Sequence, residues 1–189
     1  MKKIGFVDFY LSEWHANNYP AWIKEASEDE MQVSYCYGEI DAPNGLTNAQ
    51  WAEKYGVELC ATIDELIEKS DVLCVLAPNN PETHERLSEK ALMSGKTTYI
   101  DKTFAPDKAT AERIFANAEA NNTPCFSSSA LRFASELDEI DTSQICKIYS
   151  EGPGTLEIYS IHQIEPIVRL MNARAKRVMF LGTEQHPSY

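Results

Sequence analysis

Short apolar segments recur along the first two thirds of the chain, separated by stretches whose apolar positions have helical spacing. The apolar segments have the length of strands rather than of helices. Residues 72–77 are apolar at every position, as expected for a central parallel strand that is covered on both faces. The predicted strands are residues 3–9, 31–37, 72–77, 97–101 and 125–128.

Capping residues and apolar spacing predict helices between these strands. Thr62 and Glu65 are expected to form a capping box, in which the threonine hydroxyl accepts from the Glu65 backbone N–H and the glutamate reaches back to Thr62. Asn80 and Pro81 begin another helix, which Gly95 ends. The predicted helices are residues 21–26, 49–55, 62–69, 80–95 and 107–120. This alternation predicts an α/β fold with a doubly wound parallel sheet over residues 1–132.

The pattern changes after Arg132 and predicts the beginning of an α+β second domain over residues 133–189. The chain has few strands there, and a free-standing sheet normally needs more of them. We therefore expect either that the chain is truncated or that another subunit completes the sheet. The predicted elements are strands at residues 145–149, 156–161 and 178–181 and a helix at residues 163–171.

The balance of charges restricts the partners. The 189 residues include 17 Lys and Arg against 29 Asp and Glu, a net charge of −12, and the 43% of hydrophobic residues are enough for a core. An acidic surface repels nucleic-acid phosphates and anionic lipid heads. No segment approaches the roughly 20 apolar residues of a membrane span. The sequence predicts a soluble globular protein that binds neither nucleic acid nor a membrane.

The cysteines bear on compartment and on metal binding. The chain has five, an odd number, and they lie far apart and mostly in apolar segments. We therefore expect reduced thiols and a cytoplasmic protein. A zinc site is the alternative, but there is no CxxC pair and the four histidines lack ligand-like spacing, so no metal is predicted.

Ligands of a doubly wound sheet bind beyond the carboxyl ends of its strands. Several motifs at and between these positions occur in the order and at about the intervals of one known family: Ala52-Glu53-Lys54-Tyr55-Gly56-Val57, Ile63-Asp64-Glu65-Leu66, Ala77-Pro78-Asn79, His84, Gly95-Lys96, Asp101-Lys102-Thr103, Leu131-Arg132-Phe133 and His162-Gln163-Ile164-Glu165. Together they resemble the Gfo/Idh/MocA oxidoreductases.

The resemblance extends from the first strand to about Met171. It implies a Rossmann-type domain that binds NAD or NADP, followed by a second domain built on a large open sheet. It also implies hydride transfer at a hydroxyl carbon of a sugar, a polyol or a related small molecule. We expect a homo-oligomer that pairs through the second domain.

The resemblance implies two catalytic residues. Lys102 would hydrogen-bond the reacting hydroxyl, and an ammonium aimed at a developing oxyanion stabilises it by several kcal/mol. His162 stands at the family's active-site histidine and can pass a proton near neutral pH; a structural role is the alternative. The family commonly has an aspartate four residues earlier, where this chain has Ile158, and Tyr159 and Glu165 are candidates to replace it.

The resemblance also implies a set of cofactor-binding residues. Glu39, for example, would hold an adenosine ribose hydroxyl, with an exposed turn residue as the alternative, and Asp101 would lie near the nicotinamide. Three aromatic residues near the first turn either stack on a ligand or cover a helix–sheet seam: Trp14, Tyr19 and Trp22. The expected cofactor-binding residues are Asp8, Phe9, Tyr10, Glu39, Ala77, Pro78, Asn79, His84, Asp101 and Arg132.

The first turn departs from the dinucleotide pattern. G-x-G-x-x-G glycines allow the backbone to approach the pyrophosphate, but here only Gly5 remains, and Asp8 stands about where the first glycine belongs. A carboxylate about 5 Å from a phosphate costs about 3 kcal/mol at an effective dielectric constant of about 20, roughly a hundredfold in affinity. The sequence therefore favours an NAD(P)-dependent oxidoreductase. The alternative is a non-catalytic ligand-binding or regulatory protein that has lost dinucleotide binding.

Overall fold

The computed structural model describes residues 1–179 and 181–183. It divides into two compact units, Met1–Ser127 (unit 1) and Ser128–Tyr189 (unit 2), and each is described by itself.

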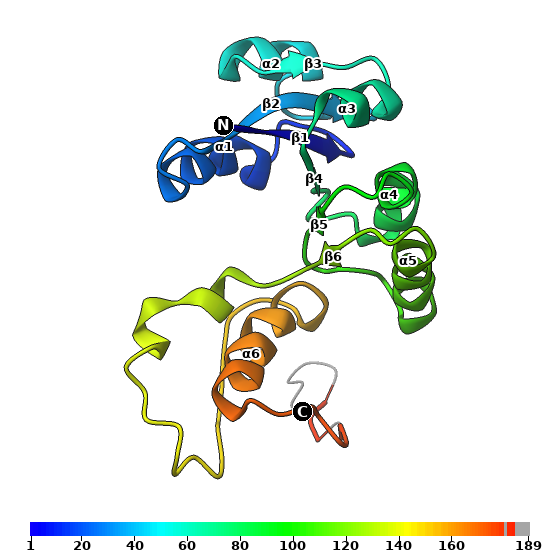
Figure 1. Cartoon of the computed structure of the whole chain (residues 1–189). Coiled ribbons are helices and arrows are strands. Elements are labelled where there is room, and N and C mark those ends of the chain that lie inside the picture. Colours follow the sequence, from blue (N-terminus) through cyan, green and yellow to red (C-terminus); the bar gives the residue numbers. More distant parts are fainter. Residues whose placement is uncertain (180, 184–189) are drawn as a thin grey trace. The chain divides into compact units, whose positions relative to one another are not determined.

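Unit 1 is built on a six-stranded sheet, all parallel, in the order β3-β2-β1-β4-β5-β6 (Figure 1). The order reverses between β1 and β4, where Val7 pairs with Val75. Adjacent loops diverge at such a point and leave room for a ligand. The strands are β1 (Lys2–Asp8), β2 (Met31–Gly38), β3 (Glu58–Leu59), β4 (Val72–Val75), β5 (Thr98–Ile100) and β6 (Cys125–Phe126).

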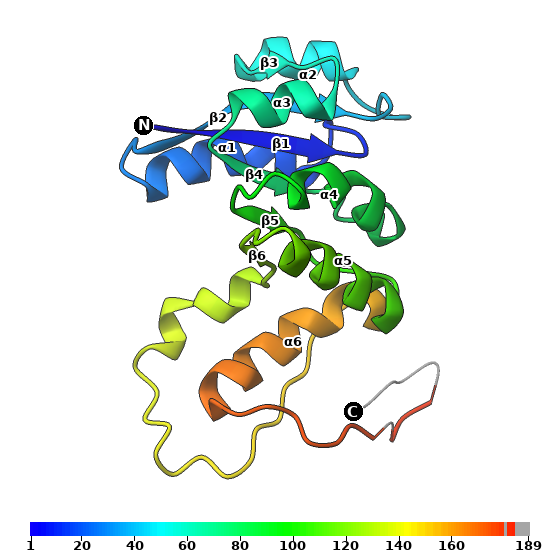
Figure 2. The same ribbon diagram turned by 45° about the vertical axis from the view of Figure 1, so that its right-hand side comes forward.

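Helices cover both faces of this sheet (Figure 2). Side chains alternate along β1, so Phe6 packs under α1 and α2 while Val7 packs under α3, α4 and α5. Two hydrophobic cores result, one on each face. The helices of unit 1 are α1 (Trp14–Ala26), α2 (Asn48–Tyr55), α3 (Ile63–Lys69), α4 (His84–Leu92) and α5 (Lys108–Ala120), with a 3₁₀ turn, η1 (Pro81–Thr83), before α4.

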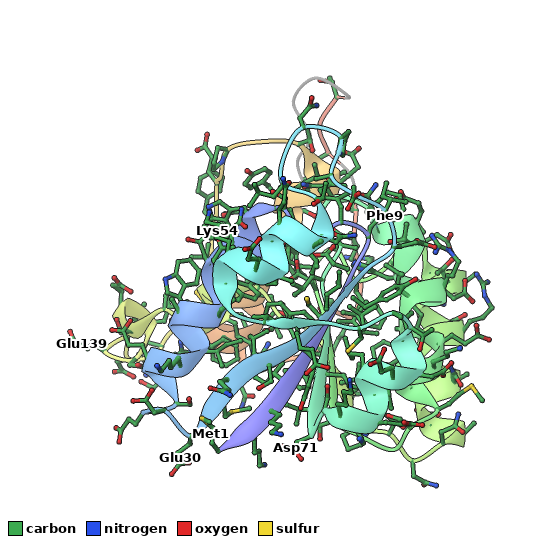
Figure 3. The ribbon with its side chains drawn as sticks, turned by 90° about the horizontal axis from the view of Figure 1, so that it is seen from above. Met1, Phe9, Glu30, Lys54, Asp71 and Glu139 are labelled. Carbon is green, nitrogen blue, oxygen red and sulfur yellow. The ribbon has the colours of Figure 1, made fainter. Side chains whose placement is uncertain are left out.

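The two edges of the sheet are well separated. Figure 3 shows Met1, Glu30 and Asp71 together at the amino-terminal edge and Phe9 at the opposite end of β1. The candidate residues that follow the strands therefore lie at the carboxyl edge of unit 1.

The structure confirms the predicted Rossmann-type parallel sheet. The prediction missed β3, which has only two residues. It also began the first helix too late, because α1 starts at Trp14, where the Glu13 side chain caps it.

Unit 2 differs from its prediction. Residues 156–161 are not a strand but the first part of α6 (Leu156–Met171), because their apolar positions continue into one longer helix. Residues 145–149 are irregular, and no described residue of unit 2 belongs to a strand. Of the strand predicted at residues 178–181, Phe180 lies outside the described residues and the others are irregular. The remaining elements are two 3₁₀ turns, η2 (Ala130–Phe133) and η3 (Ser135–Leu137).

One side chain ties the first turn of unit 1 to the loop after β2. Asn48, nearly buried at the start of α2, accepts from the Leu11 backbone N–H at 3.1 Å. Its amide donates to the carbonyls of Gly38 at 3.0 Å and Ile40 at 2.8 Å. These bonds satisfy the backbone N–H of Leu11 and the carbonyls of Gly38 and Ile40.

We predict that Asn48→Ala lowers the free energy of unfolding by about 2–3 kcal/mol, because it removes all three partners at once. Urea unfolding measures this. The control, Asn18→Ala, removes a single bond to the Trp14 carbonyl and should cost less than about 1 kcal/mol. Equal losses in the two variants would contradict the role given to Asn48.

Candidate active site at the carboxyl edge

Asp8 ends β1 and is 1% exposed. Its Oδ1 accepts from the Ala77 backbone N–H at 3.0 Å, whereas Oδ2 accepts no hydrogen bond from the described residues. Burial, and then the nearby charge of Glu13, raise the pKa of Asp8 well above its usual value, and the Ala77 hydrogen bond only partly opposes this. The structure therefore favours the neutral carboxylic acid at the position where the sequence suggested a charged one.

The N-terminus of α1 is capped by a carboxylate of the chain itself. Glu13 accepts from the backbone N–H of His15 at 2.7 Å and from that of Ala16. Its Oε2 is also 3.2 Å from Nδ1 of the His15 imidazole. A helix N-terminus attracts anions, and here Glu13 is the anion that it holds.

A buried polar chain continues from His15 to the end of β5. Nε2 of His15 is 3.6 Å from Oδ2 of Asp101, and the Tyr99 hydroxyl donates to the other carboxylate oxygen at 2.7 Å. Asp101 is fully buried. Burial and then the Asp101 charge raise the pKa of both Tyr99 and Tyr19, which keeps these phenols protonated as donors. Asp101 is thus a buried residue at the end of β5, and its place near the nicotinamide stays a prediction.

Lys102 follows Asp101 directly. Its side chain is half-buried at the carboxyl edge of unit 1. The Tyr99 hydroxyl bonds Oδ1 of Asp101, and His15 lies 3.6 Å from Oδ2, so the residue before Lys102 is anchored at this edge.

Four expected cofactor residues follow β4: Ala77, Pro78 and Asn79 in the loop, and His84 at the start of α4. His84 is fully buried, with Nδ1 3.0 Å from the Phe104 carbonyl oxygen and Nε2 2.7 Å from that of Leu76. His84 therefore links the loop after β4 to the loop that contains Phe104. Ala77 and Pro78 are buried and Asn79 is exposed, so Asn79 presents its side chain at the surface.

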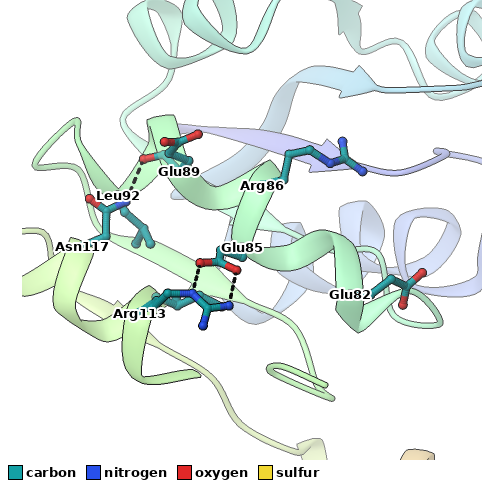
Figure 4. Close-up of a pocket in the computed structure, with 8 residues that line it drawn as sticks. Glu82, Glu85, Arg86, Glu89, Leu92, Arg113 and Asn117 are labelled. Atoms are coloured by element: carbon teal, nitrogen blue, oxygen red, sulfur yellow. Dashed lines mark hydrogen bonds and ion pairs between the residues drawn. The ribbon is translucent and has the colours of Figure 1, made fainter. Parts of the chain in front are cut away.

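Glu39 follows β2 and forms an ion pair with Arg86 of α4. Figure 4 shows Arg86 beside a groove between α4 and α5, where Arg113 binds Glu85 through two hydrogen bonds of 2.6 and 2.8 Å. The arginines of this groove are thus paired with carboxylates. The groove is therefore a weaker candidate for a site than the edge around Lys102.

The aromatic residues of α1 are unequally exposed. Trp14 is 60% and Trp22 47% exposed, and their rings meet edge to face with centroids 5.4 Å apart. Tyr19 is partly buried against the core under α1. Tyr19 therefore covers the helix–sheet seam, whereas the two tryptophans present their rings to solvent. Phe9 and Tyr10, in the first turn, are both half-buried.

Unit 2 contains the expected residues His162 and Arg132. Nδ1 of His162, on α6, is 2.6 Å from the Ser129 hydroxyl oxygen, and the Tyr159 ring lies beside the imidazole at 5.7 Å between centroids. Glu165 instead pairs with Arg132 at 2.7 Å. Sequence reasoning gave Ser129 no role, although it lies just after a predicted strand.

Within residues 1–179 and 181–183 there is no cluster of His, Cys, Asp or Glu that could hold a metal ion. In the same residues, no helix is both long and apolar enough to cross a membrane. All five cysteines are free thiols.

Comparison with known proteins identifies the scaffold of unit 1. Residues 36–129 match the model of the Gfo/Idh/MocA family, described as an oxidoreductase family with an NAD-binding Rossmann fold. This Rossmann domain belongs to the Gfo/Idh/MocA family. The match begins within β2, so β1, the first turn and α1 lie outside it. No curated protein matches the sequence.

Solved structures of oxidoreductases share the fold of the Gfo/Idh/MocA domain. A dehydrogenase (MviM) from Clostridium difficile is 19% identical, with a TM-score of 0.68 over 96% of this chain and 60% of that protein. A probable oxidoreductase, yhhX, is 18% identical, with a TM-score of 0.66 over 90% of this chain and 54% of that protein. The chain therefore spans little more than half the length of these two proteins.

A third structure was solved with a nicotinamide cofactor. It is a biliverdin reductase from Synechocystis sp. PCC 6803 in complex with biliverdin and NADP⁺. It is 17% identical, with a TM-score of 0.54 over 72% of this chain and 40% of that protein. At these identities, the solved structures establish a common fold.

The family's description implies that the domain binds a dinucleotide. The turn between β1 and α1, however, does not fit the pyrophosphate of such a ligand. The backbone N–H groups of His15 and Ala16 already bind Glu13, and that of Leu11 binds Asn48. No glycine lies between Asp8 and Glu13 to let a phosphate approach. A pyrophosphate placed here in the usual way would meet the carboxyl groups of Asp8 and Glu13, and three of the backbone donors are already bound.

The raised pKa of Asp8 predicts a specific pH dependence of stability. A carboxyl group whose pKa is higher in the folded than in the unfolded state stabilises the fold fully below the unfolded value, and this stability is lost as pH rises through the folded value. We predict that Asp8→Asn, which mimics the neutral acid, gains stability over the wild type as pH rises through this window. The gain should reach at most about 1.4 kcal/mol per pH unit.

Urea unfolding at a series of pH values measures this effect. The control, Asp29→Asn, replaces a carboxylate that is 72% exposed and should leave the pH profile unchanged. If the free energies of unfolding of Asp8→Asn and the wild type differed by the same amount at every pH, Asp8 would have the same pKa in the folded and the unfolded state, which would contradict the prediction.

Proposed function

We propose that the protein is an oxidoreductase that transfers hydride between NAD or NADP and a hydroxyl carbon of a sugar- or polyol-like small molecule. The observation that carries the proposal is the position of Lys102, next to the buried Asp101 at the carboxyl edge of a Gfo/Idh/MocA domain. Ligands of doubly wound sheets bind at this edge.

Lys102 has the chemistry that the reaction needs. Its ammonium donates to the substrate hydroxyl and stabilises the negative charge that develops on that oxygen. A lysine on a fixed backbone needs little reorganisation as this charge develops, and the Tyr99–Asp101–His15 contacts supply such a backbone. Within the proposal, Lys102 is the catalytic residue of unit 1.

In unit 2, we propose that His162 relays a proton. The Ser129 hydroxyl, 2.6 Å from Nδ1, orients the imidazole and takes the place of the acid that Ile158 does not provide. An imidazole oriented at Nδ1 can exchange a proton through Nε2. Arg132, predicted to bind the cofactor, is paired with Glu165 and helps to hold α6 beside η2.

The second candidate is a non-catalytic ligand-binding or regulatory protein on the same scaffold. The observation that favours it is the first turn, whose donors are bound to Glu13 and Asn48. Such a protein would bind a sugar-like ligand at the carboxyl edge without binding a dinucleotide.

We predict that Lys102→Ala lowers kcat/KM for oxidation of the best substrate in a sugar and polyol panel at least about a hundredfold, because it removes the group that stabilises the alkoxide. Formation of NADH or NADPH, followed by absorbance, measures this. The control, Lys108→Ala, removes a lysine that is 87% exposed and should leave the rate unchanged.

Different outcomes separate the two functions. Undiminished turnover by Lys102→Ala would remove the proposed role of this lysine. Saturable binding of a panel member by calorimetry, with no reduction of NAD or NADP by the wild type, would favour the non-catalytic protein.

We also propose that the chain self-associates through unit 2. Exposed apolar side chains there include Ile158 and Ile164 on α6 and Phe133 in η2. Burying such side chains against a second copy is favourable by about 25 cal/mol per Å². Sedimentation of the wild type should show a mass that rises with protein concentration. The double variant Ile158→Glu/Ile164→Glu should have a lower mass at the same concentration. A constant monomer mass in the wild type would contradict the proposal.

A further inference from the structure

The N-terminus of α1 is the place where a Rossmann domain normally receives the pyrophosphate, through free backbone N–H groups and the positive end of the helix dipole. In this chain a carboxylate lies there instead. We infer that Glu13 competes with the dinucleotide phosphates for the N-terminus of α1 and decides how tightly unit 1 binds a dinucleotide. This inference rests on the redox partner of the proposed function.

The contacts of Glu13 are those of a bound anion. Its two oxygens accept from the backbone N–H groups of His15 and Ala16, and Oε2 also faces the His15 imidazole at 3.2 Å. Glu13 is 7% exposed, so little water reaches the carboxylate. A phosphate that entered would have to break all three contacts.

Asp8 adds a second, independent obstacle. It is 1% exposed, and its Oδ2 accepts no hydrogen bond from the described residues. A phosphate beside it would require Asp8 to stay protonated, because the charged form is repelled by Glu13 and by a phosphate alike. The first turn therefore offers an incoming phosphate two carboxyl groups, and the Leu11 N–H is already bound to Asn48.

Two substitutions at Glu13 separate its charge from its capping role. Serine is a good N-cap residue, so Glu13→Ser keeps a cap on α1 while it removes the negative charge and frees donors. Aspartate also caps helices but keeps the charge, so Glu13→Asp is the matched control. Far-ultraviolet circular dichroism and thermal unfolding show whether both variants fold like the wild type.

The test is titration of NADH and NADPH into the full chain and the two variants by calorimetry. Energy transfer from Trp14 and Trp22, which lie on α1, to the bound nicotinamide is an independent readout. We expect Glu13→Ser to bind a dinucleotide at least about tenfold more tightly than the wild type, and Glu13→Asp to bind like the wild type.

Each outcome has one meaning. Equal micromolar affinity in the wild type and Glu13→Ser would overturn the inference and leave the redox partner of the proposed function intact. Absence of binding in all variants, including Glu13→Ser/Asp8→Gly, would overturn both. Tighter binding by Glu13→Ser without oxidation of any sugar or polyol would support the inference and count against the proposed reaction.

Discussion

Buried ionisable side chains lie at the carboxyl edge of unit 1, among them Asp8, Glu13, His15 and Asp101. The arrangement of the site depends on how their charges are compensated. A buried charge is costly unless it is paired or neutralised. Each acid meets this constraint differently: Asp8 by a raised pKa, Glu13 by backbone N–H groups, and Asp101 at Oδ1 by the Tyr99 hydroxyl. Oδ2 of Asp101 accepts no hydrogen bond from the described residues. His15 lies between Glu13 and Asp101 and joins the first turn to the end of β5.

This compensation uses donors that the family's fold normally offers to a ligand. In an NAD-binding Rossmann domain the first turn leaves its N–H groups free, and the pyrophosphate supplies the negative charge. Here Glu13 supplies that charge from within the chain, so α1 is stable without a bound anion. The same bond that stabilises the helix therefore opposes the cofactor.

Local patterns were enough to predict most of unit 1. The apolar run at residues 72–77 and the Thr62 cap depend on near neighbours in the chain. The structure has a strand at Val72–Val75, and Thr62 caps α3, although Glu65 bonds the Ala61 N–H instead of that of Thr62. The Glu13 cap was missed because glutamate is not among the residues that usually cap helices. The Ser129–His162 pair could not be predicted, because it joins residues 33 positions apart in a unit whose strands were predicted wrongly.

The loop after β5, which contains Lys102, and the turn after β1, which contains Glu13, differ in how far they keep the residues typical of the family. Lys102 lies within the segment that matches the Gfo/Idh/MocA model, on a backbone held by buried contacts. Asp8 and Glu13 lie outside that segment, in the turn where the structure replaces an external anion by an internal one. A carboxylate at a helix N-terminus stabilises the helix only while no other anion takes its donors. We infer that cofactor affinity and the stability of α1 are coupled through this one side chain, so that removal of the negative charge of Glu13 alters both.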